Sequence, residues 1–201
     1  MEFTFDKIAY FYDRTIAHIK CVILIQEFVN KKFGNRFKVN YWHDVSKFFA
    51  DTHLGYYYMT FKYLGEKVSK ERECTDAWKQ HYTYETHHPE HHTFLETMNE
   101  NEIFEMVCDW LAMSYEFEEK NWTEFWWNKM SNKFEWSEDQ RLLIFEILSM
   151  GVVNKKEIIE LLDKNVKFPK WNCNWCYFVR WRIIKIKDFL SPFSKFKFFL
   201  I

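Results

Sequence analysis

Glycine and proline are scarce in this chain, which holds four glycines and three prolines among its 201 residues. Tight hairpin turns depend on glycine and proline breaks helical patterns, so this shortage disfavours a fold rich in hairpins and leaves long helical patterns intact. Aromatic residues make up 21% of the chain, so its core is built largely from rings. A chain of this length can bury a substantial core, as one domain or as one domain with an appendage. We therefore predict an all-α fold.

Long apolar runs and a disulfide framework are also missing. No stretch reaches the roughly 20 apolar residues of a membrane span. The N-terminal sequence MEFTFDKIAYFYDR carries acids and tyrosines where a signal peptide needs a basic segment and an apolar run. The five cysteines lack the regular spacing of a disulfide scaffold, and the one close pair, Cys173 and Cys176, would need further ligands to hold zinc. These absences predict a cytoplasmic protein with buried free thiols.

The charges are unevenly distributed, although the formal net charge is only −1. Residues 165–201 hold eight lysines or arginines and a single acid, Asp188. Such a basic segment can mark a contact with nucleic acid or with an anionic membrane. A tail that balances an acidic body within one fold is the commoner arrangement.

Apolar residues recur at helical spacing through most of the chain. Asn99 with Glu102, and Ser137 with Gln140, have the spacing of side chains that cap a helix N-terminus. The predicted helices cover residues 7–32, 40–49, 67–84, 99–117 and 137–151, followed by one that begins at residue 154 and one over residues 171–190.

Histidines gather in the segment HYTYETHHPEHH, residues 81–92, which holds five of the eight in the chain. Such a run shows only that a transition metal could bind to it, so partners elsewhere are needed for a functional site. Pro89 keeps His88 out of helical geometry and can open a new short helix. The predicted buried face of the helix over residues 67–84 consists of Cys74, Ala77, Trp78, His81 and Tyr82.

Partners for these histidines occur on other predicted helices. Projection at about 100° per residue places His18 inside the apolar stripe of the first helix, so its ring points at the core. The adjacent His43 and Asp44 lie in the predicted helix over residues 40–49, with Lys47 one turn beyond His43. Asp109 lies at the edge of an apolar helix face. Imidazoles and carboxylates from several helices form a ligand set for a divalent metal.

Three motifs carry a family resemblance: HDVSKF at 43–48, HHPEH at 87–91 and EMVCDW at 105–110. In this order after His18, they resemble the HD-domain phosphohydrolase superfamily, named for an adjacent His-Asp pair. They are most similar to small, uncharacterised HD-like proteins of phages and large DNA viruses. The likeness covers roughly residues 15–115.

The resemblance implies an HD-like helical bundle over residues 1–134, a helical extension with a basic aromatic tail over residues 135–201, and a location in the cytoplasm, that of the host if the chain is viral. It implies a metal-dependent hydrolase that uses one or two divalent ions (Mn, Fe, Co, Mg or Zn) on a nucleotide or another small phosphate ester. The implied ligands of the first ion are His18, His43, Asp44 and Asp109.

A second ion would be held by Asp44 as a bridge, together with His81 and His88. Lys47 would act with Asp44 in catalysis by neutralising charge on the phosphate, and His87 and His91 would support the ligands from behind.

The sequence departs from parts of the superfamily pattern. His81 and His88 are closer in sequence than the corresponding histidines of many two-metal members. A glutamate found just after the His-Asp pair in some members is missing. A Gly-Tyr-Pro motif does not follow HHPE, so a cyclic dinucleotide is not assigned as the substrate.

Other functions are compatible with the same residues. Residues 139–165 form a pattern compatible with helix-turn-helix, two short helices joined by a glycine-containing turn, and the basic tail follows them. The second of these helices is acidic, which is poor chemistry for facing phosphates. An inactive HD-like scaffold or binding protein, and a di-iron oxygenase on the same scaffold, are the remaining alternatives.

Overall fold

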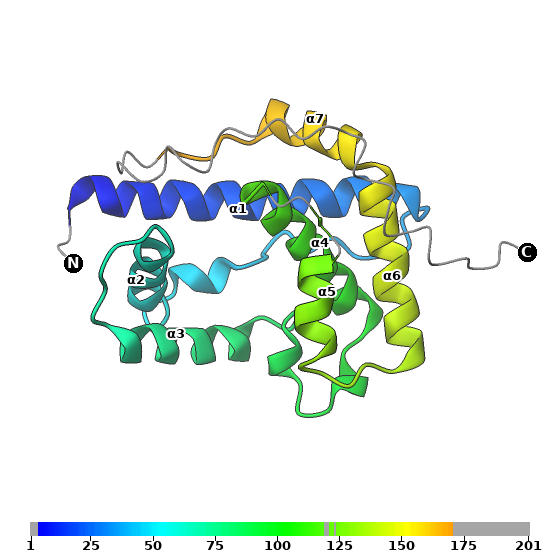
Figure 1. Cartoon of the computed structure of the whole chain (residues 1–201), viewed down its shortest axis with the longest axis horizontal. Coiled ribbons are helices and arrows are strands. Elements are labelled where there is room, and N and C mark those ends of the chain that lie inside the picture. Colours follow the sequence, from blue (N-terminus) through cyan, green and yellow to red (C-terminus); the bar gives the residue numbers. More distant parts are fainter. Residues whose placement is uncertain (1–3, 119–120, 123, 171–201) are drawn as a thin grey trace, which may run out of the picture. The chain divides into compact units, whose positions relative to one another are not determined.

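The computed structural model describes residues 4–118, 121–122 and 124–170. These residues are all-helical and contain no strand, which confirms the predicted fold class (Figure 1). The α-helices are α1 (Phe5–Lys32), α2 (His53–Tyr63), α3 (Glu71–Tyr84), α4 (Glu100–Glu116), α5 (Glu124–Ser131), α6 (Glu138–Val153) and α7 (Lys155–Asn165). Short 3₁₀ helices are η1 (Val45–Phe48), η2 (Pro89–His91) and η3 (Leu95–Thr97).

Helix α1 is the longest helix in Figure 1, and one of its faces is buried along most of its length. The Thr4 side chain caps its N-terminus by accepting a hydrogen bond from the backbone N–H of Lys7. Beyond its C-terminus, Gly34 takes a left-handed conformation with φ of +66°. The buried face includes His18, whose residue surface is 3% exposed. The projection that turned this ring toward the core is therefore confirmed.

Helices α4 and α6 begin at the two caps that the sequence predicts. The Asn99 side chain accepts backbone hydrogen bonds at the start of α4, and the Glu102 carboxylate accepts one from the Asn99 N–H at 2.8 Å. Ser137 and Gln140 make the same reciprocal pair at the start of α6. Both capping boxes satisfy backbone N–H groups that have no partner inside the helix.

The main core forms where α4 packs against α1 on one side and against α6 on the other. A Cβ atom on Gly151 of α6 would stand 2.6 Å from the side chain of Leu111 in α4, so the contact depends on the absence of a side chain. Ile144 of α6 and Leu162 of α7 belong to the same buried cluster as the apolar residues of α1 and α4.

The predicted glycine-containing turn between α6 and α7 is wrong. Gly151 lies inside α6, and the single residue Asn154 is both the C-cap of α6 and the N-cap of α7. A helix-turn-helix motif needs a turn of about 3–4 residues. Helices α6 and α7 therefore meet at a single residue, because α6 extends over residues that the sequence pattern assigned to the turn.

Helices α2 and α3 pack closely against each other, and α2 also contacts α1. Gly55 of α2 permits this approach, since a Cβ atom there would stand 2.3 Å from both the Ala77 side chain and the Glu73 carbonyl oxygen. His81 of α3 is buried, as predicted, but the predicted burial of Trp78 is wrong, because 46% of this residue is exposed. Tyr82 is half-buried.

Three of the five cysteines, Cys21, Cys74 and Cys108, are buried free thiols, as predicted. The pair Cys173 and Cys176 and the predicted helix over residues 171–190 lie outside the described residues. No helix within the described part of the chain has both the length and the apolar character to cross a membrane.

Candidate metal centre

The His43-Asp44 pair lies in a turn, so the prediction of an α-helix over residues 40–49 is wrong. The Asn40 side chain accepts a hydrogen bond from the backbone N–H of Trp42 at 2.9 Å, and residues 41–44 form a turn. Asp44 follows with φ of 58°, a left-handed conformation that aspartate adopts more readily than most residues. Only a short 3₁₀ helix, η1, then forms.

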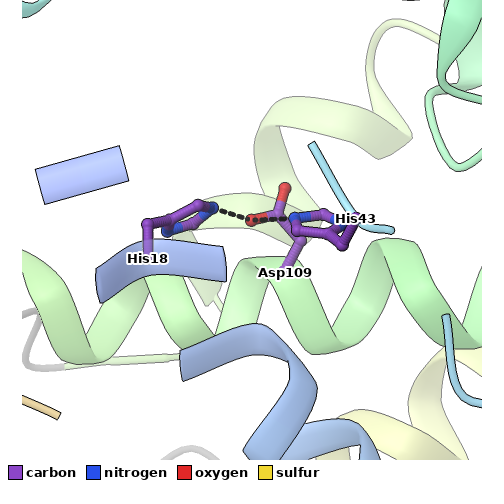
Figure 2. A group of neighbouring side chains, drawn as sticks. All are labelled: His18, His43 and Asp109. Atoms are coloured by element: carbon purple, nitrogen blue, oxygen red, sulfur yellow. Dashed lines mark ion pairs between the residues drawn. The ribbon is translucent and has the colours of Figure 1, made fainter. Parts of the chain in front are cut away.

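Side chains from three segments converge at the first cluster, which we define as His18, His43, Asp44 and Asp109. His18 Nε2 lies 3.1 Å from Asp109 Oδ1 and 3.5 Å from Asp44 Oδ2. His43 Nε2 lies 3.5 Å from Asp44 Oδ2 and 3.9 Å from Asp109 Oδ1. Figure 2 shows both imidazoles directed at the Asp109 carboxylate between them. The four residues that the resemblance implies for a first ion are therefore neighbours in space.

The spacing within the first cluster suits a divalent ion. Ligand atoms at about 2.0–2.2 Å from one ion lie about 2.8–3.6 Å apart in tetrahedral or octahedral geometry. Three of the four separations in the cluster fall in this range. His43 Nε2 and Asp109 Oδ1 are buried and have no hydrogen-bond partner, a costly state for polar atoms unless another group satisfies them.

The second cluster, Asp44, His81 and His88, lies at the other oxygen of the same aspartate. Asp44 Oδ1 stands 3.2 Å from His81 Nε2, and that nitrogen stands 3.0 Å from His88 Nε2. Each of the three residues offers one atom within 4.8 Å of the others, a spacing that could hold a metal ion. Asp44 therefore joins the two clusters through its two carboxylate oxygens.

Hydrogen bonds from η1 to the end of α3 fix the second cluster. Ser46 Oγ lies 2.7 Å from His81 Nδ1, on the side of the ring away from Asp44. The backbone N–H of Ser46 also donates to Glu85 at 3.2 Å, just beyond α3. These bonds hold the aspartate turn and the α3 histidine in one arrangement.

Two glutamates of α4 complete the centre, Glu105 and Glu116, whose side chains are 7% and 6% exposed. The sequence motifs did not mark them as part of the site. Glu105 Oε1 lies 2.8 Å from His43 Nδ1, and Glu116 Oε2 lies 3.2 Å from His18 Nδ1. Each carboxylate thus approaches the ring nitrogen that faces away from Asp109, an arrangement that orients metal-binding histidines. Their spacing relative to Asp109, four residues before and seven after, is a helical signal that was available in the sequence.

Lys47 contacts Asp44 instead of lying one α-helical turn from His43. Its ammonium group makes a short ion pair with Asp44 Oδ2 and lies 5.2 Å from the ring centre of Tyr56. The side chain of Lys47 is 19% exposed, compared with 3% for Asp44. Lys47 is therefore a cation of the centre that solvent reaches.

The carboxylates of the centre favour their ionised forms. Burial alone would raise the pKa of Asp44, but Lys47 and His43 hold that pKa well below its ordinary value. Burial likewise opposes ionisation of Asp109, and the neighbouring His18 lowers the pKa of that carboxyl. Both groups are therefore carboxylates at neutral pH, the form that binds a metal.

The histidines of the two clusters whose pKa is shifted fall into two groups. Burial disfavours a charge on His18, but the carboxylates of Asp109 and Asp44 raise the pKa of the ring to about 10. Burial lowers the pKa of His81, and burial with the neighbouring His87 and His81 holds the pKa of His88 well below its ordinary value. The second cluster therefore presents neutral imidazoles, while His18 must lose a proton before its Nε2 can act as a ligand.

The two histidines predicted to support the ligands occupy different surroundings. His87 is 1% exposed, its Nε2 lies 3.9 Å from Asp44 Oδ1, and its Nδ1 lies 3.2 Å from Glu105. His91 is exposed, and its Nδ1 lies 2.8 Å from the Tyr82 carbonyl oxygen. The structure brings His87 into the centre and leaves His91 outside it.

Fold and site together define an all-helical protein with buried His, Asp and Glu groupings that could hold a metal ion. The chain belongs to a family of unknown function (DUF5662), whose profile matches residues 7–150. That segment contains both clusters and the two glutamates behind them. No curated protein and no solved structure gives a significant match.

Proposed function

We propose that this protein is a metal-dependent phosphohydrolase that acts on a nucleotide or another small phosphate ester. The observation that carries the proposal is the position of Asp44, whose two carboxylate oxygens face two separate sets of imidazoles. His18, His43, Asp44 and Asp109 would hold one divalent ion, and Asp44, His81 and His88 would hold a second.

The donor set agrees with this use. Buried atoms without hydrogen-bond partners face the first cluster from His43 and Asp109 and the second from Asp44 Oδ1. Nitrogen and carboxylate oxygen donors suit Mn, Fe, Co or Zn. A divalent ion held there supplies a lowered pKa for water and a positive charge beside a phosphoryl oxygen.

The chain's own residues supply orientation and charge. Glu105 accepts a hydrogen bond from the outer nitrogen of His43, and the Glu116 carboxylate lies 3.2 Å from the outer nitrogen of His18. These two carboxylates orient the rings toward the first cluster. Lys47 places a partly exposed ammonium group beside Asp44, where it binds a phosphate oxygen and stabilises charge as the phosphate ester bond breaks. A small phosphate ester fits this role, because Lys47 is the partly exposed cation in contact with the shared aspartate.

The proposal is tested by metal analysis combined with a hydrolysis assay. Purified wild-type protein is loaded with Mn²⁺, Co²⁺ or Mg²⁺ and assayed for phosphate release from nucleoside mono-, di- and triphosphates. His43→Ala and Asp44→Asn are compared with it. Asparagine is the sharper replacement for Asp44, because it also tolerates the left-handed backbone conformation while lacking the charge. We expect hydrolysis by the wild type and its loss in both variants.

Two controls separate the site from the fold. Far-UV circular dichroism checks that each variant keeps its helices, and His91→Ala, a change at an exposed histidine outside the centre, should retain full activity. Wild-type protein that binds a metal and releases phosphate from none of the esters would contradict the proposal. Oxygen consumption by an iron-loaded sample would then point to oxygenase chemistry on the same ligands.

A further inference from the structure

One carboxylate, Glu105, contacts imidazoles that face each of the two clusters. The Glu105 side chain is 7% exposed and comes from the middle of α4. Its Oε1 atom lies 2.8 Å from His43 Nδ1 and 3.2 Å from His87 Nδ1. The Asn40 side-chain amide donates to the same oxygen at 2.9 Å. Three nitrogen groups from two segments, residues 40–43 and His87, thus surround a single oxygen.

The opposite edges of the two rings face the shared aspartate. His43 Nε2 lies 3.5 Å from Asp44 Oδ2, and His87 Nε2 lies 3.9 Å from Asp44 Oδ1. The ring centres are 4.5 Å apart. Two imidazoles therefore stand side by side between one carboxylate at their Nδ1 edges and another at their Nε2 edges.

For His43 this arrangement determines which ring nitrogen carries the lone pair, and for His87 it places a carboxylate beside Nδ1. A neutral imidazole has one N–H donor and one acceptor nitrogen. A carboxylate accepts hydrogen bonds, so Glu105 favours the tautomer with a proton on Nδ1 and a lone pair on Nε2. The contact to His43 has hydrogen-bond geometry, whereas His87 Nδ1 lies at a similar distance but off the hydrogen-bond direction.

The three groups His43, His87 and Glu105 also satisfy the spacing of a metal site of their own. The Asn40 amide argues against that use, because it already donates a hydrogen bond to Oε1, the oxygen that lies near both rings. His43 would in addition have to bind metals through both nitrogens, which requires loss of both ring protons. Glu105 is better explained as an acceptor behind the ligands.

We infer that Glu105 is a positioning residue shared by both clusters, which sets the metal-binding tautomer of His43 toward the first ion and of His87 toward the second. The inference rests on the proposed function and extends it, since it makes His87 a ligand of the second ion. Glu116 is the natural comparison, because it approaches His18 alone among the histidines of the centre.

The test is a Co²⁺ titration followed by visible absorption and by calorimetry. The binding step that Asp109→Asn weakens is assigned to the first ion, and the step that His88→Ala weakens is assigned to the second. Glu105→Met removes the acceptor at similar length, and Glu105→Gln keeps a neutral acceptor. We expect Glu105→Met to weaken both steps by about 10–100-fold, the usual effect of losing a partner behind a ligand, with Glu105→Gln intermediate. Glu116→Gln should weaken the first step only.

The outcomes separate this inference from the proposed function. If the wild type binds no Co²⁺, the proposed function and the inference both fail. If it binds two ions and the Glu105 variants weaken neither step, or only the first, the inference alone is overturned. Far-UV circular dichroism checks that each variant folds. If Glu105→Met does not fold, the inference is judged on folded Glu105→Gln. It then requires that this variant bind Co²⁺ at least about threefold more weakly at both steps.

Discussion

His18 Nε2 lies 3.1 Å from Asp109 Oδ1, which links the middle of α1 to the middle of α4. Sequence periodicity places Asp109 only at the edge of an apolar helix face, where exposure to solvent is the ordinary outcome. Its side chain is 15% exposed and is directed at two imidazoles (Figure 2). The contact makes Asp109 the most direct place to test the centre.

Replacement of Asp109 by asparagine should weaken metal binding at the first cluster. Asparagine keeps the size of the side chain and removes the charged ligand. The loss should reach at least the roughly 10–100-fold that removal of a supporting partner costs. Titration with Co²⁺ measures it. Asp76→Asn is the matched control, because Asp76 is an exposed residue of α3, and an equal loss in that variant would contradict the prediction.

Removal of the metal should lower the melting temperature. A ligand present at about 100 times its dissociation constant stabilises a protein by about 2.7 kcal/mol, and 1 kcal/mol shifts the melting temperature of a chain of this size by about 2–4 °C. A chelator should therefore lower the midpoint by about 5–11 °C, and added Mn²⁺ or Co²⁺ should restore it. Melting curves that are the same with chelator and with metal would speak against a bound ion.

Metal binding should release protons at neutral pH. The pKa of His18 is raised to about 10, so its ring is charged at pH 7 before a metal binds and must lose that proton to become a ligand. The apparent affinity for the metal should rise as the pH rises from 7 toward 10, because His18 then carries the extra proton in a smaller fraction of the molecules. Calorimetry at pH 7 in buffers of different ionisation enthalpy measures the released protons, and a heat independent of the buffer would contradict the prediction.

Loss of Lys47 should reduce turnover without reducing metal content. Lys47→Met removes the ammonium group beside Asp44 and keeps a long side chain. A decrease of about 10²–10³-fold in kcat is expected if this cation stabilises developing charge. Lys62→Met is the control, because Lys62 is a more exposed lysine of α2 that pairs with Glu71. Steady-state kinetics combined with metal analysis of each sample separates an effect on turnover from an effect on metal content. Equal losses of kcat in the Lys47 and Lys62 variants would contradict a specific role for Lys47.

Substitution of Gly55 by alanine should destabilise the protein and disturb the second cluster. The added methyl group would stand 2.3 Å from the Ala77 side chain and from a backbone carbonyl of α3, the helix that carries His81. Overpacking of this kind costs about 1–3 kcal/mol. Denaturant unfolding measures the loss, with Leu54→Ala, a neighbouring exposed position, expected to have a smaller effect. If Gly55→Ala were as stable as the wild type, α2 and α3 would be able to move apart and accommodate a methyl group without a loss of stability.

The helices that local signals specify were predictable from the sequence. The capping pairs at the starts of α4 and α6 mark both boundaries, because a short polar side chain and a glutamate or glutamine three residues later satisfy free N–H groups in any context. The turn at Asp44 was not predictable in the same way. The segment that leads into this turn is held by Asn40, which hydrogen-bonds to Gln26 and Glu105 of distant helices.

The residues of the candidate site were only partly predictable from the sequence, for a related reason. Histidines and the His-Asp pair can be recognised as possible ligands one at a time, and the structure brings His18, His43, Asp44 and Asp109 together. Glu105 and Glu116 cannot be recognised in this way, because an isolated glutamate on a helix is ordinarily a solvated charge. Their spacing about Asp109 places all three acids on one face of α4, and that pattern becomes informative only when α1 covers the face.

The contact between His18 and Asp109 has a consequence for how the protein is made. During synthesis, α1 leaves the ribosome long before α4 exists, and His18 then has no carboxylate from α4 within reach. The first cluster can assemble only after α4 has emerged and packed against α1. An ion that needs all four side chains would therefore bind after the helices are in place, and its retention would report that the newly made chain had completed its core.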